Sequence, residues 1–190
     1  MNVTSYLKER IAENGGDPER ETLNVIPAKD GKPYYEDTEG NYWRSYKFIT
    51  GATSYDKVEK PADFYEGAWA CGNFQLLLAD FPAETLHDTI EGFHDTGSRC
   101  AVFEQAVKED VMGRAAAVKK EIEFVRAREK SIANYFSEMQ EKGELPLRVT
   151  HNDTKLNNIM IDDKTGKGIC VIDLDTVMPG LAMTDFGDSI

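Results

Sequence analysis

The sequence predicts an α+β fold, because strand-like and helix-like segments occupy different parts of the chain. Short runs rich in β-branched and aromatic residues lie between residues 21 and 50. Apolar residues at helical spacing take over between residues 61 and 142, and strand-like runs return between 147 and 172. This order favours helices that are segregated from antiparallel strands.

The first fifty residues are expected to form a helix and a small antiparallel sheet. Val3, Leu7 and Ile11 recur every fourth residue and are followed by Asn14-Gly15-Gly16. That spacing predicts an amphipathic helix that ends at a glycine. Strand-like runs that predict a hairpin or meander follow at residues 21–27, 34–35 and 41–50.

The central part of the chain is expected to be helical. Pro61 suits a first helical turn, and Phe81-Pro82 would stop the helix that starts there. A shorter helix is predicted over 98–110 and a longer one over 114–142, which Gly143 would end. Strands are then expected at residues 147–150, 158–161 and 168–172. The change from strands to helices places a domain boundary between residues 51 and 60.

Composition excludes several classes of protein. The 190 residues carry a formal net charge of −12, which argues against nucleic acid and anionic membranes as partners. The sequence has no apolar run long enough to cross a bilayer, and its start lacks the apolar centre of a signal peptide. The three cysteines form no CxxC pair. Together these observations predict a cytoplasmic protein.

The most informative motif lies near the C-terminal end. Residues 151–158, HNDTKLNN, read H-x-D-x-K-x-x-N, and Asp173 follows a strand-like run 20 positions after Asp153. Phosphoryl transfer from ATP needs a carboxylate for the acceptor hydroxyl, a cation for the moving phosphoryl group, and oxygen ligands for Mg²⁺. The motif supplies all three. Asp153 is the candidate catalytic base, although an Asn-Asp-Thr run is also typical of a plain turn or a helix cap.

The other motif residues are assigned by spacing and chemistry. Asn158 is the candidate Mg²⁺ ligand, since it lies five positions after Asp153, and Asn157 would then be a solvated turn residue. Lys155 could stabilise the charge of the transferred phosphoryl group, or it could be a plain surface lysine. His151 is expected to brace the loop.

Two further aspartates follow the motif. Asp173 would hold a metal ion at the end of its strand. Asp175 could be a second metal ligand, a substrate contact or a residue that stabilises its loop.

These residues resemble the catalytic loop and metal-binding segment of the kinase-like fold, in the aminoglycoside phosphotransferase and choline kinase branch. The resemblance implies a two-lobe fold, with ATP and Mg²⁺ as cofactors. Asp185-Phe186-Gly187 spells D-F-G, but it lies 32 positions after Asp153, too far to be the metal motif. In this branch an aspartate at that position braces the catalytic loop, a role the resemblance assigns to Asp185.

The resemblance also implies a hinge and two partial lobes. The run that ends at Gly51 resembles the last strand of the small lobe, so backbone groups of Lys47, Phe48 and Ile49 are expected to bind adenine. A partial small lobe would cover residues 1–50, with the hinge near 47–51, and a partial large lobe 51–190. No glycine-rich loop and no lysine strand precede the first helix, so an internal fragment with weak nucleotide binding or activity is expected.

Several longer segments are similar to the N-acetylhexosamine 1-kinase subgroup. They are GGDPERETL at 15–23, IPAKDG at 26–31, YWRSYKFI at 42–49, FQLLLADFPAETLH at 74–87 and THNDTKLNN at 150–158. This similarity implies a sugar acceptor that is phosphorylated at its anomeric hydroxyl. Choline, an aminoglycoside or homoserine is the alternative acceptor. Surfaces exposed by truncation would favour a homodimer.

Two other classes of protein fit part of the pattern. A pseudokinase or interaction fragment would keep the fold without catalysis, as the missing lysine strand suggests. A metal-dependent hydrolase could use Asp153, Asp173 and Asp175 in a two-metal site. The H-x-D-x-K-x-x-N spacing favours the phosphotransferase over both.

Overall fold

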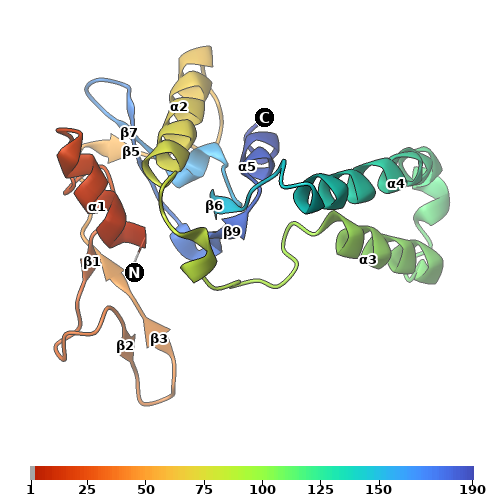
Figure 1. Ribbon diagram of the computed structural model, residues 1–190, viewed down its shortest axis with the longest axis horizontal. Coiled ribbons are helices and arrows are strands. Elements are labelled where there is room, and N and C mark those ends of the chain that lie inside the picture. The colour runs from red at the N-terminus through yellow and green to blue at the C-terminus, as the bar shows by residue number, and fades with distance from the viewer. Residues whose placement is uncertain (1–2) are drawn as a thin grey trace. The chain divides into compact units, whose positions relative to one another are not determined.

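The computed structural model describes residues 3–190, apart from the side chains at positions 130, 133, 134 and 137. The chain forms two compact units. The first combines the residues up to 87 with residues 148–190, and the second is residues 88–147. In Figure 1 the first unit is coloured red to yellow and blue, and the second green to cyan. The lobe boundary expected near residue 50 is a different division and stays a prediction.

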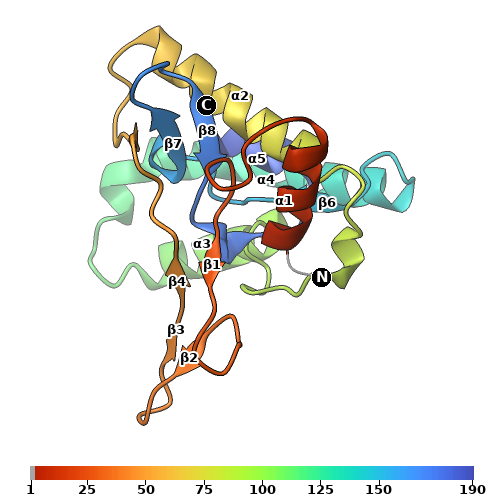
Figure 2. The same ribbon diagram turned by 90° about the vertical axis from the view of Figure 1, so that its left-hand side faces the viewer.

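Two helices begin the first unit. Helix α1 spans Val3–Glu13, and Gly15 follows at a φ of 78°, so the predicted glycine at the end of this helix is confirmed. Helix α2 spans Pro61–Leu77, with proline in its first turn as expected. The Asp63 carboxylate accepts a hydrogen bond from the Lys60 backbone N–H at the start of α2. Figure 2 shows α1 alongside α2, and their buried residues share one core cluster.

The small strands form two separate antiparallel pairs. Strand β1, Val25–Ile26, pairs with β4, Ser45–Tyr46, and strand β2, Tyr35–Glu36, pairs with β3, Tyr42–Trp43. The prediction of one strand over 41–50 is therefore wrong. The Asp37 carboxylate fixes the tight β2–β3 turn by accepting bonds from the Asn41 and Trp43 side chains. β4 pairs instead with β1, and the change of partner interrupts the strand at Arg44.

A three-stranded antiparallel sheet carries the residues around the motif. Its order is β5 (Ala52–Thr53), β7 (Ile159–Asp162) and β8 (Gly168–Val171). Helix α2 covers one face of the β7–β8 hairpin, where Ile159, Ile161 and Val171 join the main core cluster. Cys170 lies in a smaller cluster with Leu23 and Ile49. The hairpin is thus buried between two sets of apolar side chains.

The sheet's neighbours complete the first unit. Strand β6, Arg148–Thr150, is expected from the sequence. It pairs with β9, Met178–Gly180, a strand that the sequence did not predict. Helix α5, Ala182–Asp188, contacts β6. Single turns of 3-10 helix lie at η1 (Ala83–Thr85), η3 (Leu156–Asn158) and η4 (Leu174–Thr176). None of the helices in residues 3–190 is long and apolar enough to span a bilayer.

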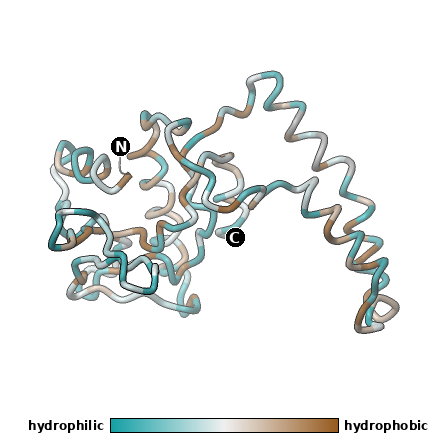
Figure 3. The backbone as a smooth tube through the Cα atoms, turned by 90° about the horizontal axis from the view of Figure 1, so that it is seen from below, coloured by the Kyte–Doolittle hydropathy of each residue, from teal (hydrophilic) through white to brown (hydrophobic). Residues whose placement is uncertain are grey.

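The second unit is a pair of helices. Helix α3 spans Thr96–Glu109, and the Asp95 carboxylate caps it by accepting the Ser98 backbone N–H. The 3-10 turn η2, Ala115–Val118, leads into α4, Lys119–Glu141. Two bonds from the Arg126 guanidinium to the Glu104 carboxylate join the helices, each 2.7 Å long. Hydrophilic and hydrophobic positions alternate along this unit in Figure 3. The two helices expected here are confirmed.

Gly168 is held against helix α2, and we expect alanine there to destabilise the fold. A Cβ atom at this position would lie 2.6 Å from the Glu66 carbonyl oxygen, which is helix backbone and cannot rotate away. The Gly168→Ala change should lower the free energy of unfolding by about 1–3 kcal/mol. Urea unfolding measures this. The control is Gly72→Ala, at an open position in α2, which should stabilise by up to about 1 kcal/mol. Equal effects of the two changes would contradict the packing argument.

Asp162 gives the first unit a pH dependence. Hydrogen bonds from the Thr165 backbone, the Arg20 guanidinium and the Thr165 hydroxyl lower the pKa of Asp162 to about 2. A carboxyl group whose pKa is lower in the folded protein than in the unfolded chain stabilises the fold at pH values above its unfolded-state pKa. This stabilisation is lost as the pH falls through the folded-state pKa. We therefore expect stability from this group to disappear between about pH 4 and pH 2.

Arg20→Met should raise the pKa of Asp162 and reduce the slope of unfolding free energy against pH in that range. Carboxyl NMR titration and urea unfolding at pH 2–5 measure both effects. Lys32→Met removes an equal charge beside the exposed Asp30 and is the matched control. An unchanged Asp162 pKa in Arg20→Met would rule out the ion pair as a cause.

Candidate active site

The motif forms a loop between β6 and β7 that His151 braces from inside. The His151 side chain is 1% exposed, and its ring lies edge-on to the Phe74 ring. Its Nε2 atom is 2.9 Å from the carbonyl oxygen of Ile172, and its own carbonyl oxygen accepts the Thr176 hydroxyl at 2.7 Å. The ring therefore links the start of the loop to the segment that carries Asp173. This geometry suits the bracing role expected of His151.

Asp185 holds the backbone of the same loop. Its carboxylate accepts the backbone N–H groups of His151 at 2.9 Å and Asn152 at 2.7 Å, and the Gln75 side chain at 2.9 Å. Asn152 has a φ of 67°, in the left-handed region that asparagine tolerates. Two consecutive N–H groups with one residue left-handed form a concave anion-binding shape. Here the anion is the protein's own carboxylate, which is 3% exposed.

Asp153 lies at the surface of this loop with two donors on one oxygen. The Lys155 ammonium is 2.6 Å from Asp153 Oδ2, and the Asn158 amide donates to the same atom at 2.9 Å. Partial burial disfavours the carboxylate, but the bonds from Lys155 and Asn158 outweigh it and hold the pKa of Asp153 below its ordinary value. Within the described part of the chain no donor occupies Oδ1. Asp153 is therefore ionised at neutral pH and can accept a hydroxyl proton through Oδ1.

The β7–β8 hairpin brings Asn158 and Asp173 to one end of the sheet. The Ile172 N–H donates to the Asn158 carbonyl oxygen at 2.8 Å, so the residues on either side of the hairpin's open end are neighbours. Asp173 has a φ of 60°, and its side chain is exposed. The Asn158 side-chain nitrogen is committed to Asp153, which leaves the amide oxygen as a ligand.

These oxygens fit Mg²⁺, which binds through one or two carboxylates together with substrate phosphates and water. Among the described residues no group of three or more histidine, cysteine, aspartate or glutamate side chains could hold a metal ion by itself. A site built from Asn158 and Asp173 would be completed by substrate phosphates and water.

Asp175 lies beside an arginine that the sequence did not single out. On η4, its carboxylate accepts a hydrogen bond from Arg44 Nη2, and the Arg44 guanidinium lies over the Tyr46 ring. The contact spans 131 positions in the sequence, so no local pattern could have revealed it. It fits the loop-stabilising alternative for Asp175. Its roles as a metal ligand or substrate contact stay predictions.

The expected hinge residues continue from β4 without strand pairing of their own. The Lys47 N–H donates to the Asn24 carbonyl oxygen at 2.8 Å. Phe48 is 81% exposed, whereas Ile49 is buried against Leu23 and Cys170. The segment is thus anchored by Ile49 next to the β7–β8 hairpin. Adenine binding by these backbone groups stays a prediction.

Comparisons with known proteins identify the family and the fold of the chain. Residues 18–190 match the family described as APH, the phosphotransferase enzyme family, and the chain belongs to it. The fold is similar to that of spectinomycin phosphotransferase APH(9)-Ia, solved as a complex with AMP, with a TM-score of 0.55 at 13% sequence identity. The match covers 97% of this chain and 58% of that one. The predicted kinase-like α+β fold is confirmed over that part.

Asp185 can be tested by a nearly isosteric change. Asp185→Asn replaces an acceptor-only side chain by an amide whose N–H₂ group faces another donor, so we expect a loss of roughly 2–4 kcal/mol in unfolding free energy. Amide exchange at His151 and Asn152 should accelerate as well. The control is Asp163→Asn, at an exposed carboxylate bonded to the Thr53 hydroxyl, with an effect below about 0.5 kcal/mol. Unchanged exchange at His151 and Asn152 would show that Asp185 does not hold the loop.

Proposed function

We propose that the chain carries the catalytic loop of an ATP-dependent phosphotransferase that acts on the hydroxyl group of a small molecule. The observation that carries the proposal is the position of Asp153, with Lys155 and Asn158 both bound to its Oδ2 atom. A carboxylate, a cation and an amide thus converge at one point, where the Lys155 side chain is exposed, the Asp153 side chain is partly exposed and Asn158 is buried. The membership of the phosphotransferase enzyme family gives the proposal its reaction class.

Each residue has a separate task in this proposal. Asp153 orients the acceptor hydroxyl through Oδ1 and takes its proton as the phosphoryl group is transferred. Lys155 is 51% exposed in its side chain, so its ammonium can turn from Asp153 towards a phosphoryl oxygen. Asn158 and Asp173 would hold Mg²⁺, which supplies positive charge next to the phosphates when bound. His151 and Asp185 keep the loop in place.

The acceptor that we propose is an N-acetylhexosamine, phosphorylated at its anomeric hydroxyl. The support is the similarity of residues 15–23, 42–49, 74–87 and 150–158 to the N-acetylhexosamine 1-kinase subgroup. Choline, aminoglycosides and homoserine are the alternative acceptors. The structural relative is named a spectinomycin phosphotransferase, so spectinomycin is added to the compounds to be tested.

The experiment is an assay of acceptor-dependent ADP release with Mg²⁺ and ATP. It uses the 190-residue chain and, in parallel, the whole product of its gene, against N-acetylhexosamines, choline, aminoglycosides, spectinomycin and homoserine. We expect turnover with N-acetylhexosamines and a loss of about 10²–10⁴-fold in Asp153→Asn. Asp163→Asn makes the same chemical change at an exposed turn and should keep full activity.

The other outcomes distinguish the alternatives. Turnover with a different acceptor would support the assignment as a phosphotransferase but contradict N-acetylhexosamine as its substrate. ADP release without any acceptor would favour a metal-dependent hydrolase. ATP binding without ADP release in both forms of the protein would favour a pseudokinase. Full activity of Asp153→Asn would refute the assignment of the catalytic base.

A further inference from the structure

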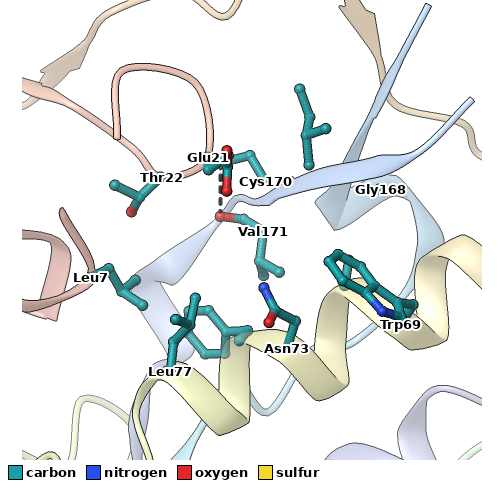
Figure 4. Close-up of a pocket in the computed structure, with 12 residues that line it drawn as sticks. Leu7, Glu21, Thr22, Trp69, Asn73, Leu77, Gly168, Cys170 and Val171 are labelled. Carbon is teal, nitrogen blue, oxygen red and sulfur yellow. Dashed lines mark hydrogen bonds between the residues drawn. The ribbon is translucent and has the colours of Figure 1, made fainter. Parts of the chain in front are cut away.

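A pocket lies between helix α2, strand β8 and the segment at residues 21–22, as Figure 4 shows. It has an outer part of about 350 Å³ and an adjacent inner part of about 20 Å³. Both parts are lined by Glu21, Trp69, Asn73, Gly168 and Ile169. None of the candidate catalytic residues lines either part, so the pocket is separate from the proposed transfer site.

The inner part contains a polar group that the described protein residues do not satisfy. Thr22 is 1% exposed, and its hydroxyl oxygen has no hydrogen-bond partner in the described part of the chain. A buried hydroxyl without a partner costs about 1–3 kcal/mol. The space beside it is large enough for one water-sized group. The Asn73 amide lines the same space and is only half-buried. A single polar group placed there would satisfy Thr22.

The charged side chains around the pocket determine whether a positively or a negatively charged group would bind there. The Lys167 ammonium is committed to Glu66 at 3.2 Å, and Glu66 also accepts the Gly168 N–H at 3.1 Å. Glu21 accepts the Asp17 N–H through one oxygen, and no cation among the described residues pairs with it. The pocket therefore keeps one negative charge. It disfavours anions and favours a positively charged group near Glu21.

The outer part has an aromatic wall. Trp69 and Tyr65 are four positions apart on α2 and are 50% and 64% exposed. Aromatic faces bind apolar groups and cations, tryptophan most strongly. Figure 4 shows Trp69 and Asn73 on the same helix, with Asn73 nearer to Val171. A ligand with a water-sized cationic head and a flat apolar body matches both parts.

We propose that this pocket is a second, non-catalytic binding site for a small primary amine with an apolar or ring-shaped body. The ammonium group occupies the inner part, where Thr22, the Asn73 carbonyl oxygen and Glu21 accept its three N–H bonds. The body stacks on Trp69 in the outer part. The site lies against β8, the strand that ends two residues before Asp173.

The test compares three ligands of similar shape and different charge. They are 2-phenylethylamine, 2-phenylethanol and 3-phenylpropionate, titrated by calorimetry and by tryptophan fluorescence. The sequence has two tryptophans, so Trp43→Phe leaves Trp69 as the only reporter. We expect saturable binding of the amine at millimolar concentration or below, at least tenfold weaker binding of the alcohol, and none of the acid. No saturable amine signal in calorimetry, or equal binding of all three ligands, would overturn the proposal.

Variants separate the pocket from other surfaces. Glu21→Gln keeps an acceptor for the Asp17 N–H but removes the charge, so it should weaken amine binding at least tenfold. Thr22→Val keeps the shape and should also weaken it. Glu36→Gln makes the same charge change on exposed strand β2 and should leave binding unchanged, as should Asp153→Asn. Thermal unfolding confirms that each variant is folded. Unchanged amine binding in folded Glu21→Gln would refute the site.

Discussion

The Asp185 carboxylate is the interaction on which the candidate active site depends. It accepts two consecutive backbone N–H groups, from His151 and Asn152, in a place where the chain turns through a left-handed residue. Without this acceptor both N–H groups would be buried and unpaired, and the loop would have no reason to keep that turn. Asp153 follows directly, so its direction depends on Asp185, a buried residue that is 3% exposed. The position of Asp153 in the candidate site is thus determined first by the backbone hydrogen bonds of its loop, and only then by the contacts of its side chain.

The β7–β8 hairpin gives that loop a rigid base. α2 packs on one of its faces, and a small cluster that includes Ile49 packs on the other. Asn158 and Asp173 lie at its open end, joined through the Asn158 carbonyl oxygen. Gly168 lies at the closed end, directly against the backbone of α2. The same hairpin therefore holds the candidate metal ligands, and its β8 strand forms one side of the second pocket.

Local patterns predicted the parts of this protein that local physics controls. The helices over 3–13, 96–109 and 119–141 followed from apolar spacing and glycine positions, and the hairpin over 159–171 from two short apolar runs. The interruption of the strand at Arg44 could not be predicted from local patterns. It arises because the residues before Arg44 pair with β2 and those after it pair with β1. The side chains of Asp153, Lys155 and Asn158, which the motif groups, are in contact in the structure, and their catalytic roles stay predictions. The Arg44–Asp175 contact and the pairing of β6 with β9 join distant segments, which a single sequence does not encode locally.

The distance between Asn152 and Asp185 along the chain has a consequence for synthesis. The acceptor lies 33 positions after the backbone N–H that it binds. At roughly 5–20 residues per second, a ribosome adds it about 2–7 s after Asn152. The β7–β8 hairpin closes on its own within about 1–10 μs once both strands have emerged. The end of β8 at Val171 precedes Asp185 by 14 positions, so a nascent chain carries both hairpin strands next to an unformed candidate loop for roughly 0.7–3 s. Over those last 14 positions the loop is open to proteases and chaperones, while both strands beside it have already been synthesised.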